Sequence, residues 1–430
     1  MKFLKLIKNS KGGNNELRYF SLGIFFLPSA PLISSIILLL TAISTSLKKK
    51  NYFRDNWNLP FILSTFLMIF SCIANSIFRE EIYKNFYSLE LIWIGLFNWI
   101  PYFWVFWIFQ NFSSNHIQRR KICFLLLSGS IPVLISGMLQ YFFKLHGPFE
   151  FIGGLVTWYS RKIDFGDGMT GLFNNANYLG MWLNILWPFS LMFFLENRKN
   201  PKKSLATLTI LILVLCCTVL TFSRNAWLGL IIGTILLLGK KSLRWVLPLI
   251  LIASFPILMG LGLFPNPNIT ELGQNIVPNT VLHQFIDINL DNLSALPRIQ
   301  IWNESINLIS QKPFLGWGSA SFPVLFGIKN NSIFFGHTHN LPLEISLSFG
   351  IPAALILITS IILILNKSKI KIFSSNDTNE IPFDKACFVS TFLIFFSHMF
   401  DIQYFDIRIG LTFWILLGAL KNIFKTPQSI

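Results

Sequence analysis

Residues 204–222 read SLATLTILILVLCCTVLTF, a stretch of 19 residues without a charge. An α-helix rises about 1.5 Å per residue, so roughly 20 apolar residues cross the hydrocarbon core of a bilayer. Lys202 and Lys203 precede the stretch and Arg224 follows it. A chain inside lipid must satisfy its own backbone hydrogen bonds. The stretch therefore predicts a transmembrane helix.

The same pattern repeats along the whole chain. The 430 residues are 53% hydrophobic and only 13% charged, whereas a soluble protein carries about 25% charged residues. The charges gather in short clusters between apolar runs. The sequence thus predicts an all-α polytopic membrane protein, a single integral membrane domain over 1–430 with about 12 transmembrane segments. The apolar runs lie at about 20–46, 60–77, 90–110, 122–143, 177–195, 204–222, 225–239, 245–263, 341–365, 386–403 and 409–424.

The first apolar run decides the topology. It carries Pro28 and Pro31 in its first half, and basic clusters flank it on both sides. Positive clusters mark the cytoplasmic side of a membrane, so we expect a hairpin that enters and leaves on that side. Most later Lys and Arg residues then fall inside as well. The pattern predicts a multi-pass inner (plasma) membrane protein with both termini cytoplasmic, and it explains the net charge of +16 without a nucleic acid partner.

Two long segments are predicted to be periplasmic. These are residues 144–176 and residues 264–340, and the larger loop precedes the last three membrane segments. The larger loop contains one amphipathic helix that Pro297 opens at a first-turn position. We expect this helix to lie on the membrane surface, with an apolar face formed by Trp302, Ile306 and Ile309.

Two arginines on the expected outer side are candidates for anion binding. Arg224 lies in a tight turn at the start of a membrane helix, where free N–H groups and the helix dipole favour an anion. An arginine that reaches the lipid headgroups is an equally good interpretation. Arg298 opens the loop helix, and an ordinary solvated charge is its simpler interpretation.

Polar residues also stand before two membrane helices. His337, His339 and Asn340 precede the helix at 341–365, and a histidine at a helix N-terminus tends to stay neutral and able to accept a proton. Asn175 and Asn177 precede the helix at 177–195 and are typical capping residues. Capping explains the histidines as well.

Metal and nucleotide chemistry receive little support from the sequence. Neither the five cysteines nor an acidic residue stands at a metal-ligand spacing from the two histidines. There is no glycine-rich loop for a nucleotide. We therefore expect no metal site and no cofactor. The turn at 398–408 holds two carboxylates, a histidine and Arg408, and an ion-pair lock is favoured there over a binding rim.

Five short motifs occur in a recognisable order. They are G-x-F-x-N-x-N-Y at 171–178, S-R-x-x-W-L-G at 223–229, R-x-x-x-W at 298–302, K-P-F-L-G-W-G at 312–318 and H-N-x-x-L-E-I at 339–345. Together they resemble the O-antigen ligase/polymerase family of bacterial membrane glycosyltransferases. Departures from the family pattern are Ala176, where proline is usual, and Met169, where a basic residue is common.

The resemblance implies a function and roles for these residues. Family members move a glycan from an undecaprenyl-diphosphate carrier to an acceptor hydroxyl on a lipid or glycan, on the periplasmic face and without metal. Carried over, Arg224 and Arg298 bind the diphosphate and His339 is the catalytic base. Supporting positions are Asn340, Asn175, Asn177 and His337.

Other functions are open at this stage. A branch of the same family carries the label of bicarbonate transporter, so transport of inorganic carbon or another solute is the main alternative. Transport would predict ionisable residues along a path through the bilayer, whereas most of them here stand at the expected outer rim. A structural membrane partner without activity is a third interpretation.

Overall fold

A computed structural model describes residues 15–49, 51–78, 87–164, 167–277, 279–286, 296–330, 335–374 and 382–425. The elements up to residue 220 are α2 (Asn15–Phe26), α3 (Pro31–Lys48), η1 (Tyr52–Arg54), α4 (Leu59–Ile77), α6 (Leu89–Ile94), η2 (Gly95–Asn98), α7 (Ile100–Ile108), η3 (Phe109–Phe112), α8 (His116–Gly129), α9 (Ile131–Phe143), β1 (Phe149–Phe151), β2 (Val156–Trp158), α10 (Ala176–Asn197) and α11 (Pro201–Leu220). The later elements are α12 (Arg224–Leu238), η4 (Lys240–Ser242), α13 (Leu243–Gly260), α14 (Pro267–Ile276), α15 (Asn279–Ile286), α16 (Pro297–Gln311), α17 (Phe322–Asn330), α18 (Leu341–Phe349), α19 (Ile351–Ser374), α20 (Pro382–Ser397) and α21 (Ile407–Lys425).

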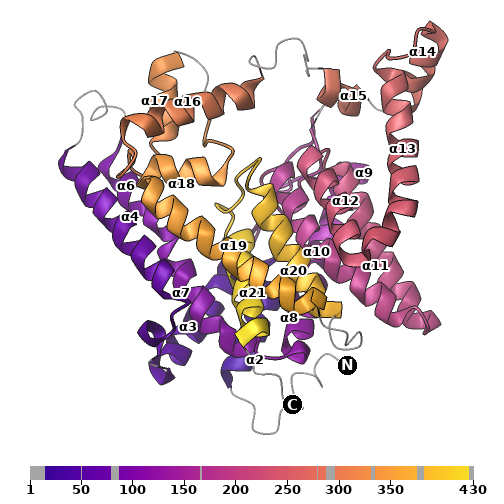
Figure 1. Cartoon of the computed structure of the whole chain (residues 1–430). Helices are drawn as coiled ribbons and strands as arrows, with labels where there is room; N and C mark the ends of the chain where they lie inside the picture. Colours follow the sequence, from indigo (N-terminus) through magenta and orange to yellow (C-terminus); the bar gives the residue numbers. More distant parts are fainter. Residues whose placement is uncertain are drawn as a thin grey trace.

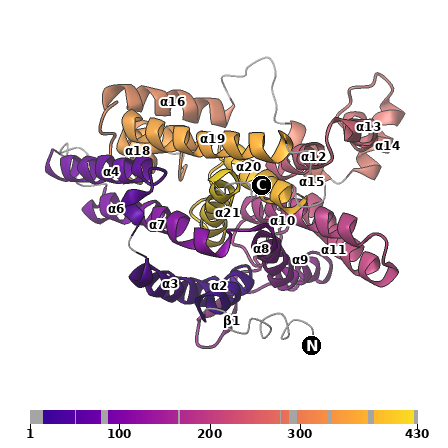
Figure 2. The ribbon, with the colours of Figure 1, turned by 60° about the horizontal axis from the view of Figure 1, so that its bottom comes forward.

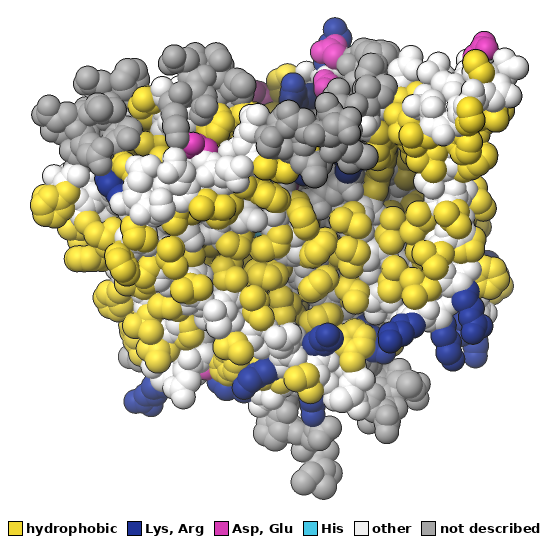
Figure 3. Space-filling view, turned by 45° about the horizontal axis from the view of Figure 1, so that its top comes forward, with side chains coloured by type: hydrophobic (Ala, Val, Ile, Leu, Met, Phe, Trp, Pro, Cys, Tyr) yellow, Lys and Arg dark blue, Asp and Glu magenta, His cyan; other side chains and the backbone are white. Residues whose placement is uncertain are grey.

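The fold is the predicted all-α polytopic membrane bundle (Figure 1). Within the described residues, nine helices are long and apolar enough to cross a membrane, and α12 is a shorter apolar helix. A broad band of hydrophobic side chains covers the middle of the face seen in Figure 3, with Lys and Arg side chains gathered below it. The number of about twelve spans stays a prediction.

The predicted N-terminal hairpin is confirmed. The chain reverses at residues 27–30, between α2 and α3. Ser34 Oγ donates to the carbonyl oxygen of Gly23 at 2.7 Å. Glu16 near the start of α2 pairs with Lys48 at the end of α3. The two arms therefore run antiparallel, and the ends that lie away from the turn meet.

Three predicted spans contain breaks where the sequence bends the helix. Residues 89–112 form α6, η2, α7 and η3, with Pro101 in the first turn of α7. Ser130 separates α8 from α9, whose first turn holds Pro132. Proline lacks the N–H that would continue the preceding helix, so a break before it is expected. Gly350, at φ +92°, separates α18 from α19.

The two long segments contain more structure than predicted. Residues 149–158 form a small antiparallel hairpin, β1 and β2, which the all-α prediction did not include. Aromatic and β-branched residues favour these strands, and Gly153 and Gly154 supply the positive φ angles of the turn. Trp158 Nε1 donates to the Ser29 carbonyl at 2.8 Å, so this hairpin rests on the α2–α3 turn.

The larger segment, 264–340, contains four helices, α14 to α17, where one was predicted. The predicted loop helix is α16, and its first residue is Pro297 as expected. Its predicted apolar face was partly wrong, because Ile306 is 56% exposed. The buried face holds Ile301, Leu308 and Ile309 instead, and α16 packs on α18 (Figure 2).

Backbone hydrogen bonds and a close approach at Gly316 attach residues 316–318 to the end of α18. Trp317 N donates to Leu347 O at 2.7 Å, and Gly318 N donates to Ser348 O at 3.0 Å. A Cβ at Gly316 would lie 2.6 Å from the Leu347 carbonyl oxygen, so no larger residue fits this close approach. The K-P-F-L-G-W-G motif thus holds the end of α18 in place.

Both ends of the described chain lie at one face. Glu16 and Lys425 line a single cavity there, whereas residues 144–176 and 264–340 meet at the other face, where Arg161 and Arg298 line one cavity. We call the latter the loop face. At the margin of the bundle, α13 packs mainly on α14 (Figures 1 and 2).

Candidate functional site

A polar cavity of about 300 Å³ opens at the loop face. The predicted residues Arg224, Arg298, Asn175 and Asn177 all line it. They come from three separate regions, the start of α10, the start of α12 and the start of α16. The remaining lining residues are Arg161, Lys162, Asp167, Gly168, Thr170, Ala176, Thr221, Phe222, Ser223, Asn225 and Asp401.

Two helix N-termini meet at this cavity. Asn175 caps α10 by accepting a hydrogen bond from Asn177 N at 2.7 Å, and Ser223 caps α12 by accepting one from Ala226 N at 3.4 Å. A Cβ at Gly180 would lie 2.8 Å from the Cβ of Ala226, so the glycine lets the two helices approach. Both N-termini present the positive end of a helix dipole to the same space.

A buried glutamine holds the loop that forms the cavity wall. Gln140, in α9, accepts from Thr170 N and Gly171 N at 3.0 and 2.8 Å, and it donates to Arg161 O at 2.5 Å. Gly168 lies against the turn before α12, where a Cβ would come within 1.8 Å of Thr221 O. The first long segment is thereby fixed beside Arg224.

The cavity is electropositive. Four basic side chains line it, against the two carboxylates of Asp167 and Asp401, which leaves an excess of two positive charges. Arginine forks match phosphate oxygens in a bidentate way. A diphosphate carries compensating negative charge, so this wall fits such a group. The basic residues are Arg161, Lys162, Arg224 and Arg298.

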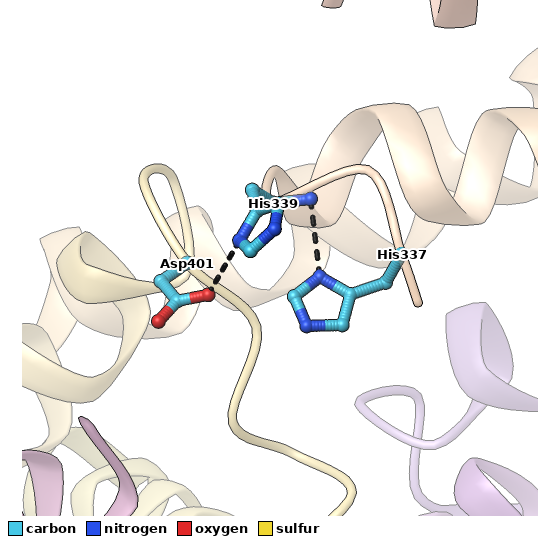
Figure 4. Close-up of side chains that lie close together, drawn as sticks. All are labelled: His337, His339 and Asp401. Carbon is cyan, nitrogen blue, oxygen red and sulfur yellow. Dashed lines mark hydrogen bonds and ion pairs between the residues drawn. The ribbon is translucent and has the colours of Figure 1, made fainter. Parts of the chain in front are cut away.

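Asp401 joins the cavity to His339 (Figure 4). It lines the cavity, and its Oδ1 lies 2.8 Å from His339 Nδ1. The His339 side chain is 25% exposed and the Asp401 side chain 7%. When Nδ1 carries the proton and donates to Asp401, the lone pair of the imidazole is on Nε2. The contact therefore fixes the orientation of the His339 ring next to the cavity that Asp401 lines.

The Asp401 carboxylate is fixed on both oxygens. Ile402 N donates to Oδ1 and Gln403 Nε2 donates to Oδ2, each at 3.0 Å. Burial acts to raise the pKa of Asp401, but the hydrogen bond from His339 and the charges of His339, His337 and Arg298 hold the pKa below its ordinary value. The carboxylate is thus ionised at neutral pH.

His337 lies against His339 in the same segment. Its Nδ1 accepts a hydrogen bond from His339 N at 3.2 Å (Figure 4), and the ring centroids are 4.2 Å apart. Burial, together with the positive charges of His339 and Arg298, lowers the pKa of His337 to about 4. His337 is consequently neutral at physiological pH, and Arg298 is close enough to act on it.

Hydrogen bonds between two segments place His339 opposite Asp401. Leu341 N donates to His398 O at 2.8 Å, and Asn340 Nδ2 donates to Met399 O at 2.9 Å. Asn340 also caps α18 by accepting from Leu343 N at 3.0 Å. His339 itself adopts φ +54°, a conformation that costs a non-glycine residue energy and is common at functional sites.

The same three side chains could hold a metal ion. His337, His339 and Asp401 each offer one ligand atom, and these atoms lie within 4.8 Å of one another. Two histidines with one carboxylate are a familiar ligand set for Zn²⁺ or Fe²⁺. This ligand set was not predicted from the sequence, because its acidic member, Asp401, lies 62 residues after His339 in the chain.

The predicted ion-pair lock in the turn at 398–408 is formed by Asp406 and Arg408. Arg408 also stacks on Phe173, 3.4 Å from the ring centroid. Asp401 takes no part in that pair and belongs to the cavity instead. Sequence reasoning did not assign it to the site, nor Arg161 and Lys162. The only local signal was that all three are charged residues on the expected outer side.

The sequence of residues 209–358 matches a family described as O-antigen ligase. The matched segment is about a third of the chain and contains both predicted arginines and His339, whereas Asn175 and Asp401 lie outside it. No curated protein matches the sequence. The match gives no support to the transporter alternative. Residues 209–358 are thus similar to the O-antigen ligase family, and this similarity supports a membrane glycan transferase of that general type.

Proposed function

We propose that the protein transfers a glycan from an undecaprenyl-diphosphate carrier to a hydroxyl group of a lipid or glycan acceptor. The observation that carries this proposal is the electropositive cavity, whose wall includes the carboxylate that holds His339. The reaction takes place at the loop face, which in this proposal is the periplasmic face of the inner membrane. Both termini are then cytoplasmic.

The basic wall binds the donor. Arg224 and Arg298 hold the diphosphate, and Arg161 and Lys162 add positive charge at the same cavity. As the bond between the anomeric carbon and the diphosphate oxygen breaks, negative charge grows on the leaving group. Fixed guanidinium groups stabilise that charge more in the transition state than in the ground state. Asn175 and Asn177 support the wall by forming the N-terminus of α10.

His339 activates the acceptor. Its Nε2 removes the proton from the acceptor hydroxyl while the oxygen attacks the anomeric carbon, and the diphosphate departs. Asp401 keeps Nδ1 protonated and stabilises the imidazolium that forms. Asn340 and His337 act as positioning residues, through the cap of α18 and through the hydrogen bond to His339 N. This chemistry needs no metal ion, because the lipid donor is already activated.

Complementation of a gene deletion tests the proposal. The surface polysaccharide of the deletion strain is compared by gel after expression of wild type, His339→Ala or Arg224→Ala at equal protein level. We expect wild type to restore long or lipid-linked glycan and both variants to fail. Arg244→Ala is the matched control, because Arg244 is an exposed arginine near the start of α13, close to the basic turn at η4.

The gel pattern also separates two forms of the activity. Accumulated short chains in the deletion strain indicate a polymerase, and normal chains missing from the lipid indicate a ligase. A polysaccharide profile that does not change on deletion contradicts the proposal. Restoration by His339→Ala contradicts the role of His339 alone.

A further inference from the structure

A second cavity lies at the face opposite the loop face. It has a volume of about 540 Å³, larger than the cavity beside His339. It opens where the start of α2 and the end of α3 meet the ends of η3 and α21. The lining residues are Glu16, Leu17, Thr45, Lys48, Lys49, Asn51, Asp55, Trp107, Gln110, Asn111, Phe112, Ser114, Gln118, Lys421, Asn422 and Lys425.

The floor of this cavity is a closed polar network. Lys421 is 1% exposed and pairs with both Asp55 and Gln110. Asn422 Nδ2 donates to Gln110 O at 2.8 Å. Lys421 is buried and paired with these two side chains, and its removal would leave the Asp55 carboxylate with one partner fewer. The floor therefore has a structural role.

The mouth of the cavity is different, because its basic side chains reach solvent. The side chains of Lys48 and Lys425 are 63% and 49% exposed, and Lys49 is exposed as well. Around the whole cavity four lysines face only two carboxylates, Glu16 and Asp55. Lys48 pairs with Glu16, Lys425 pairs with Asp55, and Lys49 donates to Asn111. The four lysines nevertheless exceed the carboxylates among the lining residues by two positive charges.

Apolar side chains beside the mouth show which environment it faces. Leu47, which precedes Lys48 in the chain, is 75% exposed, and Phe53, which precedes Arg54, is 83% exposed. Exposed apolar residues beside basic ones are typical of a surface that contacts the headgroup region of a bilayer. Trp107, an interfacial residue type, also lines the cavity. The cavity consequently opens at the level of the phosphate groups of the lipids.

We propose that this cavity binds the headgroup of an anionic phospholipid. The phosphate lies between Lys48, Lys49 and Lys425 at the mouth, Asn111 and Gln118 provide side-chain amides near it, and the acyl chains run beside Leu47 and Phe53. Basic pockets between membrane helices recognise anionic lipids through the same combination of charge and depth. The bound lipid joins the N-terminal hairpin to the end of α21.

Lipid binding to the full-length protein in detergent tests this site. Native mass spectrometry measures retention of dioleoylphosphatidylglycerol or dioleoylphosphatidylcholine, and the thermal midpoint Tm is recorded with each lipid. The test variant is Lys48→Gln/Lys49→Gln/Lys425→Gln, which leaves Lys421 intact. The control is Lys199→Gln/Lys202→Gln/Lys203→Gln, which removes equal charge from exposed lysines in the α10–α11 turn, outside the cavity.

We expect phosphatidylglycerol to bind and raise Tm in wild type and in the control, and to bind about tenfold or more weakly to the test variant. Phosphatidylcholine should give no comparable effect. Equal binding of phosphatidylglycerol to both variants overturns the proposal, and so does equal binding of the two lipids to wild type. If inorganic phosphate alone raises Tm as much as phosphatidylglycerol, the cavity is a phosphate site and the lipid assignment is wrong.

Discussion

Replacing Asp401 with asparagine tests whether the carboxylate makes His339 a base. In wild type the carboxylate accepts a hydrogen bond from Nδ1 and leaves the lone pair on Nε2. An asparagine can instead donate its amide N–H to Nδ1. That exchange moves the imidazole proton to Nε2, which can then no longer accept a proton from the acceptor hydroxyl. The side chain keeps its size, although one of the two donors Ile402 N and Gln403 Nε2 loses its acceptor.

The size of the effect follows from the geometry. The Asp401–His339 contact measures 2.8 Å, and the Asp401 side chain is only 7% exposed, so water screens the contact weakly. A hydrogen bond to a charged group in such a place is worth about 1.5–3 kcal/mol. At about 1.4 kcal/mol for each factor of ten, kcat should fall roughly 10- to 100-fold. The largest possible fall in kcat corresponds to the complete loss of general base catalysis, which is about 10²–10⁴-fold.

The assay is glycan transfer by purified protein from an undecaprenyl-diphosphate-linked glycan. We expect kcat to fall while KM for the donor stays near the wild-type value, since the arginines are intact. Asp164→Asn is the matched control, because Asp164 is a carboxylate of the long segment 144–176 at the loop face but is 70% exposed. The double variant with His339→Ala should lose no more activity than His339→Ala alone. Additive losses, or a kcat like that of the control, would refute the coupling of the two residues.

Three further predictions concern the arginines, metal ions and pH. Arg224→Lys or Arg298→Lys keeps the charge but loses the bidentate fork, so kcat/KM for the donor should fall about tenfold or more in transfer assays. Treatment with EDTA should leave transfer unchanged, whereas micromolar Zn²⁺ should inhibit by occupying His337, His339 and Asp401; inactivation by EDTA that Zn²⁺ reverses would contradict the metal-independent mechanism. Burial lowers the pKa of His398 to about 4, below its unfolded value of about 6.5, so stability should be lost as pH falls from 6.5 to 4. The loss is about 3 kcal/mol at most, and Tm of His398→Gln should fall less than that of wild type over this range.

The helices could be predicted from sequence because their cause is local. Most apolar runs are long enough to cross the bilayer, and a helix satisfies its backbone hydrogen bonds within its own residues. The N-terminal hairpin was predictable for a related reason, since Pro28 and Pro31 fall at the turn and basic residues flank both arms. The face of α16 was predicted less well. Ile306 has the right spacing, but α16 packs on α18 through the side that holds Ile301.

The site could be predicted only in part, because its members meet through tertiary packing. Arg224, Arg298 and His339 each lie in one of the five sequence motifs, and the two arginines line the same cavity. Asp401 carries no motif of its own. It reaches His339 only because α19 and α20 cross the bundle and return the chain to the loop face. Arg161 reaches the cavity through a loop that Gln140 fastens to α9.

Arg298 connects the two halves of the site, and this connection bears on the order of events. Its positive charge helps to keep the pKa of Asp401 low and, with burial, lowers that of His337. A diphosphate bound to Arg298 offsets that charge, so the environment of Asp401 and His337 becomes more favourable to a proton. In the proposed mechanism the same arginine thus binds the leaving group and acts on the two residues that position His339.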